Sequence, residues 1–128
     1  TDAVVTHLLN LVRLIGSPGY PSEPERTQAR LRASVERAWR PAGTARQLVA
    51  VAADGDRSPM LGGITAPTRV IHGQADPLVP VAAAHDLAAK IRGAELDLID
   101  GMGHDLPLAL LPRLAEGIAV NAGRWAGR

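Results

Sequence analysis

The chain has 128 residues, of which 46% are hydrophobic, and this is enough for one modest core of the size usual for a single domain. Its 14 Lys and Arg residues balance its 13 Asp and Glu residues, so the basic excess of a nucleic-acid-binding protein is missing. No apolar run approaches the ~18 residues of a membrane-spanning helix, and without cysteine there is neither a disulfide nor a thiolate metal site. With no visible signal peptide, we expect a globular cytoplasmic protein that binds neither nucleic acid nor membranes.

The first 58 residues are predicted to be helical. Apolar side chains recur at spacings of three and four residues in three segments, over 3–15, 23–40 and 44–53. A break rich in proline and glycine separates the first two helices. Two capping-box patterns indicate where the second and third begin, Ser22 with Glu25 and Thr44 with Gln47. The third helix is expected to bury Leu48, Val51 and Ala52.

The remainder alternates strands and helices. Residues 54–67 lack periodicity and are predicted to be a connector. Two short strands, a helix between them and a final helix entered near Pro112 follow, with the strands over 68–72 and 94–99 and the first helix over 81–91. This order favours a parallel α/β sheet with an attached helical layer. We therefore divide the chain into a helical segment, 1–58, and an α/β segment, 59–128.

One acidic and one imidazole side chain follow the two predicted strands. Asp76 lies in "HGQADP" after the first strand, and His104 lies in "GMGHDLP" after the second. Because loops at the carboxyl ends of parallel strands meet at one edge of a sheet, the two side chains are expected to meet there. A carboxylate that holds one imidazole nitrogen leaves the other free to take a proton from a nucleophile. The alternative to a catalytic role is that Asp76 only initiates an Asp-Pro turn and that His104 is only a polar residue of its loop.

The polar residues next to Asp76 and His104 are expected to have structural roles. His72 ends the first strand and is expected to be structural, with a metal site built from it, Asp76 and His104 as the minor alternative. Asp105 is expected to accept hydrogen bonds from backbone amides of the following turn. We expect no metal and no cofactor.

The residues around this pair resemble a known superfamily. The segments "TAPTRVIHGQADPLVP" and "AELDLIDGMGHDLP" resemble the last two strand-helix units of the α/β-hydrolases. The helical stretch "YPSEPERTQARLRASVERAWRPAGTARQLVAVAADGDRSP" is similar to the second half of the cap in bacterial esterase-like members, close to the aclacinomycin methylesterase type. The resemblance implies the C-terminal portion of an α/β-hydrolase fold, with Asp76 as triad acid, His104 as triad base and a small ester as substrate.

The nucleophile of that superfamily is missing from the sequence. It occupies a G-x-S-x-G turn between a strand and a helix, and none of the four serines follows a predicted strand, namely Ser17, Ser22, Ser34 and Ser58. The chain also begins at Thr1 without an initiator methionine, so we expect the C-terminal part of a longer serine-type hydrolase, inactive alone. An epoxide hydrolase and a haloperoxidase-like or dehalogenase-like enzyme are alternatives within the superfamily. The alternative outside catalysis is a truncated module that self-associates or binds the missing N-terminal half through an exposed strand edge.

Overall fold

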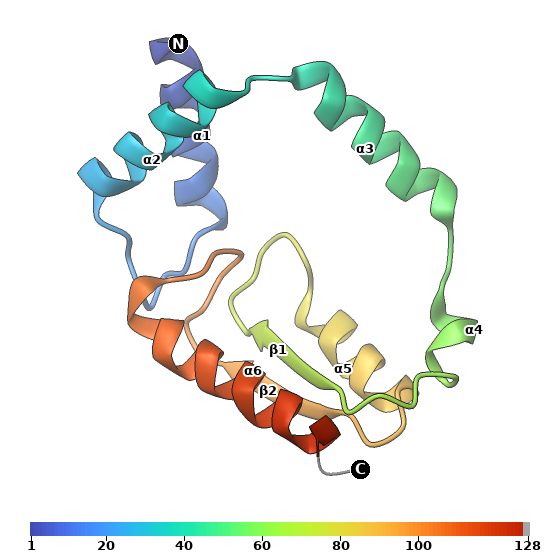
Figure 1. Ribbon diagram of the computed structural model, residues 1–128. Helices are drawn as coiled ribbons and strands as arrows, with labels where there is room; N and C mark the ends of the chain where they lie inside the picture. The colour runs from blue at the N-terminus through green and yellow to red at the C-terminus, as the bar shows by residue number, and fades with distance from the viewer. Residues whose placement is uncertain (127–128) are drawn as a thin grey trace.

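The computed structural model describes residues 1–126, in which a helical part precedes a small α/β part (Figure 1). The helical part comprises α1 (Asp2–Ile15), α2 (Pro24–Arg37) and α3 (Pro41–Asp54). The α/β part comprises α4 (Ser58–Leu61), β1 (Arg69–Gly73), α5 (Val81–Lys90), β2 (Glu95–Ile99), the 3-10 turn η1 (Leu108–Leu110) and α6 (Leu111–Ala126). None of the helices within these residues is both long and apolar enough to cross a membrane.

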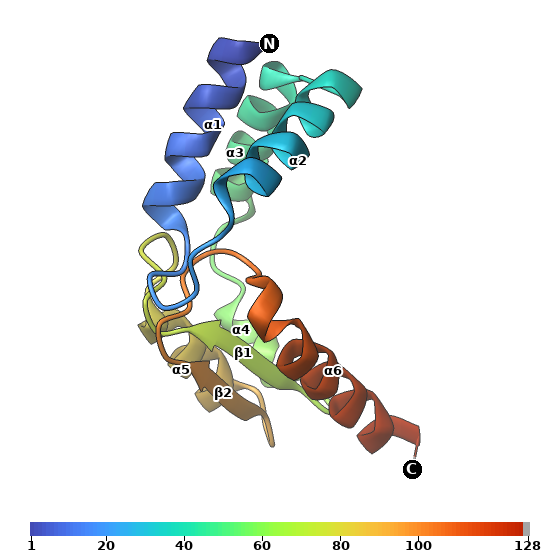
Figure 2. The ribbon, with the colours of Figure 1, turned by 90° about the vertical axis from the view of Figure 1, so that its left-hand side faces the viewer.

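The two strands form a parallel pair, as the sequence predicts. Their register runs from Arg69 opposite Glu95 to Gly73 opposite Ile99. A parallel connection needs a crossover, which α5 provides. Figure 2 shows α5 and α6 on opposite sides of the sheet, so both faces of the pair are covered. As a result, the loops that follow β1 and β2 leave the sheet at the same edge.

The main core lies where α6 meets the end of the sheet. Its buried members are Ile99, Met102 and Leu110, against which Tyr20, Ile71 and Leu114 pack. Met102 belongs to the loop between β2 and η1, so the loop that carries His104 is anchored in the core two residues before the histidine. Tyr20 comes from the turn between α1 and α2, and it joins the helical part to this same core.

Within the helical part, α1 and α2 pack as a pair, and α3 stands apart (Figure 1). Val5 of α1 and Thr27 of α2 are buried between them. An ion pair of 2.6 Å joins Arg32 to Asp2. Among residues 1–126, α3 packs against no other helix or strand.

Both capping-box predictions are wrong. The helix α2 begins at Pro24 with Glu23 as its N-cap, and α3 begins at Pro41, so Thr44 lies inside its first turn rather than before it. Neither N-cap residue makes a side-chain cap hydrogen bond. Proline explains both starts, because its fixed φ suits the first turn and its missing N–H has no partner to lose there.

The predicted buried face of α3 is also wrong. Leu48 is 66% exposed and Val51 is 64% exposed, and no residue of α3 is buried. The amphipathic spacing produces the helix, but no element within residues 1–126 covers its apolar side chains. The connector over 54–67 contains one further helical turn, α4, which packs against α5. Since α4 begins at Ser58, it spans the predicted boundary between 58 and 59, and that boundary stays a prediction.

Candidate active site

Backbone hydrogen bonds join the loops after β1 and β2 directly. Gln74 N–H donates to the Ile99 carbonyl at 3.0 Å, and Ala75 N–H donates to the Met102 carbonyl at 2.9 Å. Gly73 allows this approach, because a Cβ at its position would lie 2.3 Å from the Met102 oxygen. Backbone contacts alone therefore hold the loop after β1 against the loop after β2.

The carboxylate of Asp76 is held by three hydrogen bonds. Its Oδ1 accepts the backbone N–H groups of Leu78 and Val79, each at 2.8 Å, and its Oδ2 lies 2.8 Å from Nδ1 of His104. Only 6% of the side chain is exposed. Burial by itself raises the pKa of this carboxyl group, but the hydrogen bonds from Val79, His104 and Leu78 outweigh it and hold the pKa of Asp76 below its ordinary value. Asp76 is thus a buried, ionised acceptor.

The imidazole of His104 has one fixed side and one open side. Its Nδ1 faces Asp76, while 40% of the side chain is exposed. When Nδ1 carries the proton and donates it to the carboxylate, Nε2 keeps a lone pair and can accept a proton. The pair that the sequence predicts therefore has the geometry of an orienting acid and a general base.

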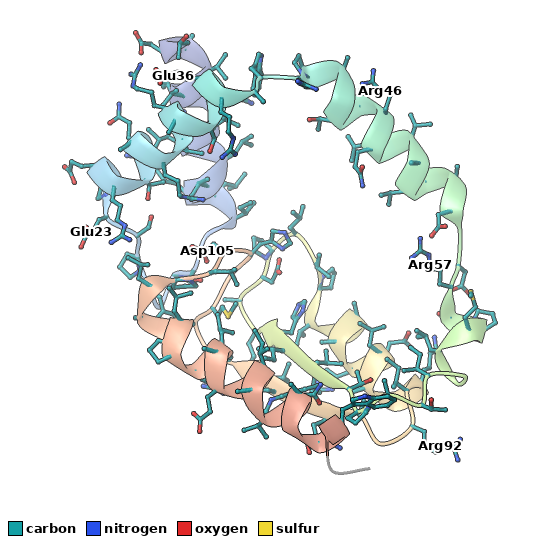
Figure 3. The ribbon with its side chains drawn as sticks, viewed as in Figure 1. Glu23, Glu36, Arg46, Arg57, Arg92 and Asp105 are labelled. Atoms are coloured by element: carbon teal, nitrogen blue, oxygen red, sulfur yellow. The ribbon has the colours of Figure 1, made fainter. Side chains whose placement is uncertain are left out.

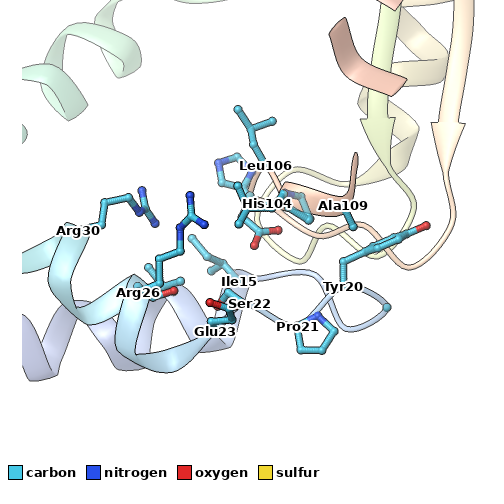
Figure 4. A pocket seen from close by; sticks show the side chains of 16 residues that line it. Ile15, Tyr20, Pro21, Ser22, Glu23, Arg26, Arg30, His104, Leu106 and Ala109 are labelled. Atoms are coloured by element: carbon cyan, nitrogen blue, oxygen red, sulfur yellow. The ribbon is translucent and has the colours of Figure 1, made fainter. Parts of the chain in front are cut away.

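His104 borders a cavity of about 780 Å³ between the α1–α2 pair and the loop over 104–109 (Figure 4). Its apolar lining includes Ile15 from α1 and Leu106 from the histidine loop. Arg26 and Arg30 extend from α2 toward the side on which His104 lies (Figure 4). A second cavity of about 390 Å³ lies over Asp76 and His104 themselves. The open side of the imidazole therefore faces space that a small organic molecule can enter.

His72 supports the loop that carries Asp76. Its Nε2 lies 3.0 Å from the carbonyl oxygen of Val79 and 4.0 Å from Oδ2 of Asp76. The ring thus spans the turn from the end of β1 to Val79, which is the structural role expected for it. No group of three or more metal-ligating side chains occurs in the part of the chain that the structure describes.

The expectation for Asp105 is wrong, and Ser17 has a part that the sequence did not indicate. Asp105 accepts a hydrogen bond from the Ser17 hydroxyl instead of from the amides of the next turn. The same Ser17 Oγ accepts the backbone N–H of Gly103 at 2.8 Å. Ser17 and Asp105 lie 88 residues apart, and no local pattern reports such a contact.

Two of the other serines are bound to groups away from His104, and the third borders the same cavity as His104. The hydroxyl of Ser34 donates to the Arg30 carbonyl at 2.9 Å, and that of Ser58 accepts from Lys90 at 3.0 Å. Ser22 lines the larger cavity. None of the serine hydrogen bonds within residues 1–126 involves the ring of His104.

Comparisons with known proteins agree with the resemblance. No protein-family profile matches the chain. Over 65 residues, it is 40% identical to the rhodomycin D methylesterase DauP of Streptomyces sp. (strain C5) and 38% identical to the rhodomycin D methylesterase DnrP of Streptomyces peucetius. Each alignment covers 51% of this chain and 22% of the methylesterase.

A solved serine hydrolase has the same fold over the whole chain. The crystal structure of CarC, a serine hydrolase involved in carbazole degradation, superposes with a TM-score of 0.68 at 20% sequence identity. The match covers 100% of this chain and 48% of CarC, so the chain spans about half the length of that enzyme. In sequence and in fold, the chain is thus similar to the C-terminal portion of an α/β-hydrolase of the bacterial esterase type, and the resemblance to this superfamily is confirmed.

Proposed function

We propose that this chain supplies the acid and the base of a serine-type hydrolase that cleaves a small carboxylic ester. The observation that supports this most directly is the 2.8 Å contact between Oδ2 of Asp76 and Nδ1 of His104, with the acid buried and the base open to a cavity. The methylesterases that share its sequence and the serine hydrolase that shares its fold support the same reaction class.

In the proposed reaction, Nε2 of His104 takes the proton of a serine hydroxyl while the serine oxygen attacks the acyl carbon. The imidazolium that forms is stabilised by the ionised Asp76, which also keeps the ring in the required orientation. His104 then gives this proton to the departing alkoxide, and an acyl-enzyme remains. Water activated by the same nitrogen attacks the acyl-enzyme and releases the acid and the free serine.

The serine itself is proposed to lie outside these 128 residues. The sequence contains no G-x-S-x-G turn, and its most buried serine, Ser17, uses its hydroxyl to bind Gly103 and Asp105. The donors that stabilise the tetrahedral oxyanion are proposed to come from the same additional segment.

The proposed substrate is a methyl ester of a largely apolar acid. The cavity beside His104 has apolar walls from α1 and from the histidine loop, and its volume of about 780 Å³ is typical of small-molecule sites. The relatives' names state methyl ester cleavage for those proteins, and we extend it to this chain as a proposal. The α1–α2 pair then forms one wall of the substrate site.

A second proposal concerns association. Within residues 1–126, β1 pairs only with β2, so its other edge is open, and the apolar side chains of α3 are exposed. Open strand edges and apolar patches favour association, so we propose that the isolated chain binds a second copy or the segment that carries the nucleophile.

The experiment compares the 128-residue chain with the complete product of the gene that encodes it. Both are assayed with p-nitrophenyl acetate and, by proton release, with methyl esters of aromatic acids. His104→Ala should abolish turnover by the complete product, and His85→Ala, on the exposed face of α5, should not. Ester hydrolysis unaffected by His104→Ala would remove His104 from the mechanism. Turnover by the 128-residue chain alone would show that the nucleophile lies within it.

A further inference from the structure

The end of α1 lies directly against the loop that carries His104. Gly19 N–H donates to the Gly101 carbonyl at 2.9 Å, and His104 N–H donates to the Ile15 carbonyl at 2.7 Å. In Figure 3, the labelled Asp105 lies at this junction between the helical and α/β parts. The contact joins a helix that lines the cavity to the main chain of the proposed base.

A single hydroxyl lies at the centre of this junction. Ser17 Oγ accepts the N–H of Gly103 at 2.8 Å and donates to Oδ1 of Asp105. It therefore holds the residue before His104 and the residue after it. Together with the bond from His104 N–H to the Ile15 carbonyl, three consecutive residues of the loop are tied to two residues, the last residue of α1 and Ser17 just after it.

The centre of the junction is buried and tightly packed. Ser17 is 6% exposed, and Gly103 is buried. A Cβ at Gly103 would lie 2.4 Å from the carbonyl oxygen of Gly16, so the two backbones approach as closely as glycine permits. A buried hydroxyl is costly unless its hydrogen bonds are made, and both of these are made.

We infer that Ser17 is a positioning residue for the base, and that it acts through Asp105 and Gly103 to hold the His104 ring against Asp76. The bond to Asp76 fixes one ring nitrogen only, and 40% of the His104 side chain is exposed. The direction of its Cα–Cβ bond therefore depends on the residues on both sides of it, and Ser17 binds the backbone N–H of Gly103 and the side-chain carboxylate of Asp105. This inference rests on the proposed role of His104 as a base.

The first test uses the 128-residue chain and needs no turnover. Long-range ¹H–¹⁵N NMR of the histidine rings reports how much of the His104 population carries its proton on Nδ1. Ser17→Ala and Asp105→Ala should lower that population. Asp105→Asn, which keeps an oxygen acceptor for the Ser17 hydroxyl, should preserve it. Ser34→Ala is the matched control, because it removes a serine hydrogen bond on α2 that does not reach the loop.

The second test repeats the variants in the complete gene product with an ester substrate. Ser17→Ala and Asp105→Ala should lower kcat by about 10-fold to 100-fold with KM nearly unchanged, because the base is misplaced while the substrate walls remain. Asp105→Asn should keep most of the wild-type kcat.

Two results would overturn the inference. One is a Ser17→Ala protein with wild-type tautomer population and kcat. The other is an Asp105→Asn protein as impaired as Asp105→Ala, since the charge of Asp105 rather than its hydrogen bond would then be what matters. If Ser17→Ala does not fold, as far-UV circular dichroism would reveal, the two Asp105 variants decide. If the wild-type gene product hydrolyses no ester, the proposed function fails, while the NMR test still decides whether Ser17 orients the ring.

Discussion

Oδ2 of Asp76 lies 2.8 Å from Nδ1 of His104, although 28 residues separate them in the sequence. The parallel register of β1 and β2, in which Gly73 is opposite Ile99, brings their loops together. The hydrogen bond from Ala75 N–H to the Met102 carbonyl then holds the two loops together, so that the side chains of Asp76 and His104 are within contact distance. The pair is a consequence of strand register, and its chemistry can be tested by single substitutions.

Asp76→Asn should lower kcat of the complete gene product by on the order of 10⁴-fold. The amide oxygen can still accept the N–H groups of Leu78 and Val79, so the turn is retained, but the carboxylate that orients the His104 ring and stabilises its charged form is lost. Steady-state kinetics with an ester substrate measure the effect. Asp86→Asn on the exposed side of α5 is the control, and an equal loss there would point to a general effect of removing an acid.

The chain should lose stability in acid through a second, partly buried carboxylate, Asp97. Burial raises the pKa of Asp97, but hydrogen bonds and charges from Arg69 and Arg113 outweigh this and lower the pKa below its ordinary value. Because the folded pKa lies below the unfolded one, this stabilisation is complete above about pH 4 and is lost as the pH falls through the folded pKa.

Urea unfolding between pH 3 and pH 7 checks this expectation. The wild-type free energy of unfolding should fall below about pH 4. Asp97→Asn should make that decline shallower and should lower stability near neutral pH, where the ion pairs with Arg69 and Arg113 are lost. Asp100→Asn, at an exposed position, serves as the comparison. If the free energy of unfolding of Asp97→Asn fell in acid as steeply as that of the wild type, other titratable groups would be responsible for the loss of stability.

Gly73→Ala should destabilise the chain by about 1–3 kcal/mol, because the new Cβ would lie 2.3 Å from the Met102 carbonyl oxygen and would push the two loops apart. Since these loops carry Asp76 and His104, the His104 tautomer population should change as well. Gly62→Ala is the matched control, because its Cβ meets nothing within 4 Å and its backbone is already helical. Equal free energies of unfolding for the two variants would show that the loops can move apart to fit the new Cβ without loss of stability.

Association of the isolated chain should depend on the apolar residues of α3. Replacing Leu48 and Val51 by Glu should reduce the mass measured by light scattering at a given concentration, because both side chains are more than 60% exposed on a helix without a packing partner in residues 1–126. Thr44→Glu with Gln47→Glu adds the same charge to the same helix without removing apolar surface. Equal dissociation by both pairs would attribute the effect to charge, and a wild-type monomer would contradict the expectation.

Local sequence was sufficient for the α/β order and for placing Asp76 and His104 at one sheet edge. The strands over 68–72 and 94–99 were predicted within one residue, because β-branched and apolar runs bounded by glycine and proline are local signals. The meeting of the two loops then followed from the geometry of parallel strands, which does not depend on details of packing.

The helix starts and the partners of the polar side chains were not predictable in this way. The capping-box patterns at Ser22 and Thr44 predicted helix starts there. The helices instead begin at Pro24 and Pro41. The exposed face of α3 was unpredictable because periodicity reports which side chains are apolar and not whether anything covers them.

The sequence by itself determined the alternation of strands and helices and the residue types at the ends of the strands, because these depend on propensities and spacing within a few residues. Only the tertiary structure decided that Ser17 binds both neighbours of His104, and that Asp105 turns to Ser17 instead of the following turn. Those contacts join positions 86 and 88 residues apart, and they exist only once α1 is placed against the histidine loop. Which hydrogen bonds form between distant segments depends on which polar groups are buried and on how closely the two backbones approach. Both are properties of the packed chain and not of the local sequence.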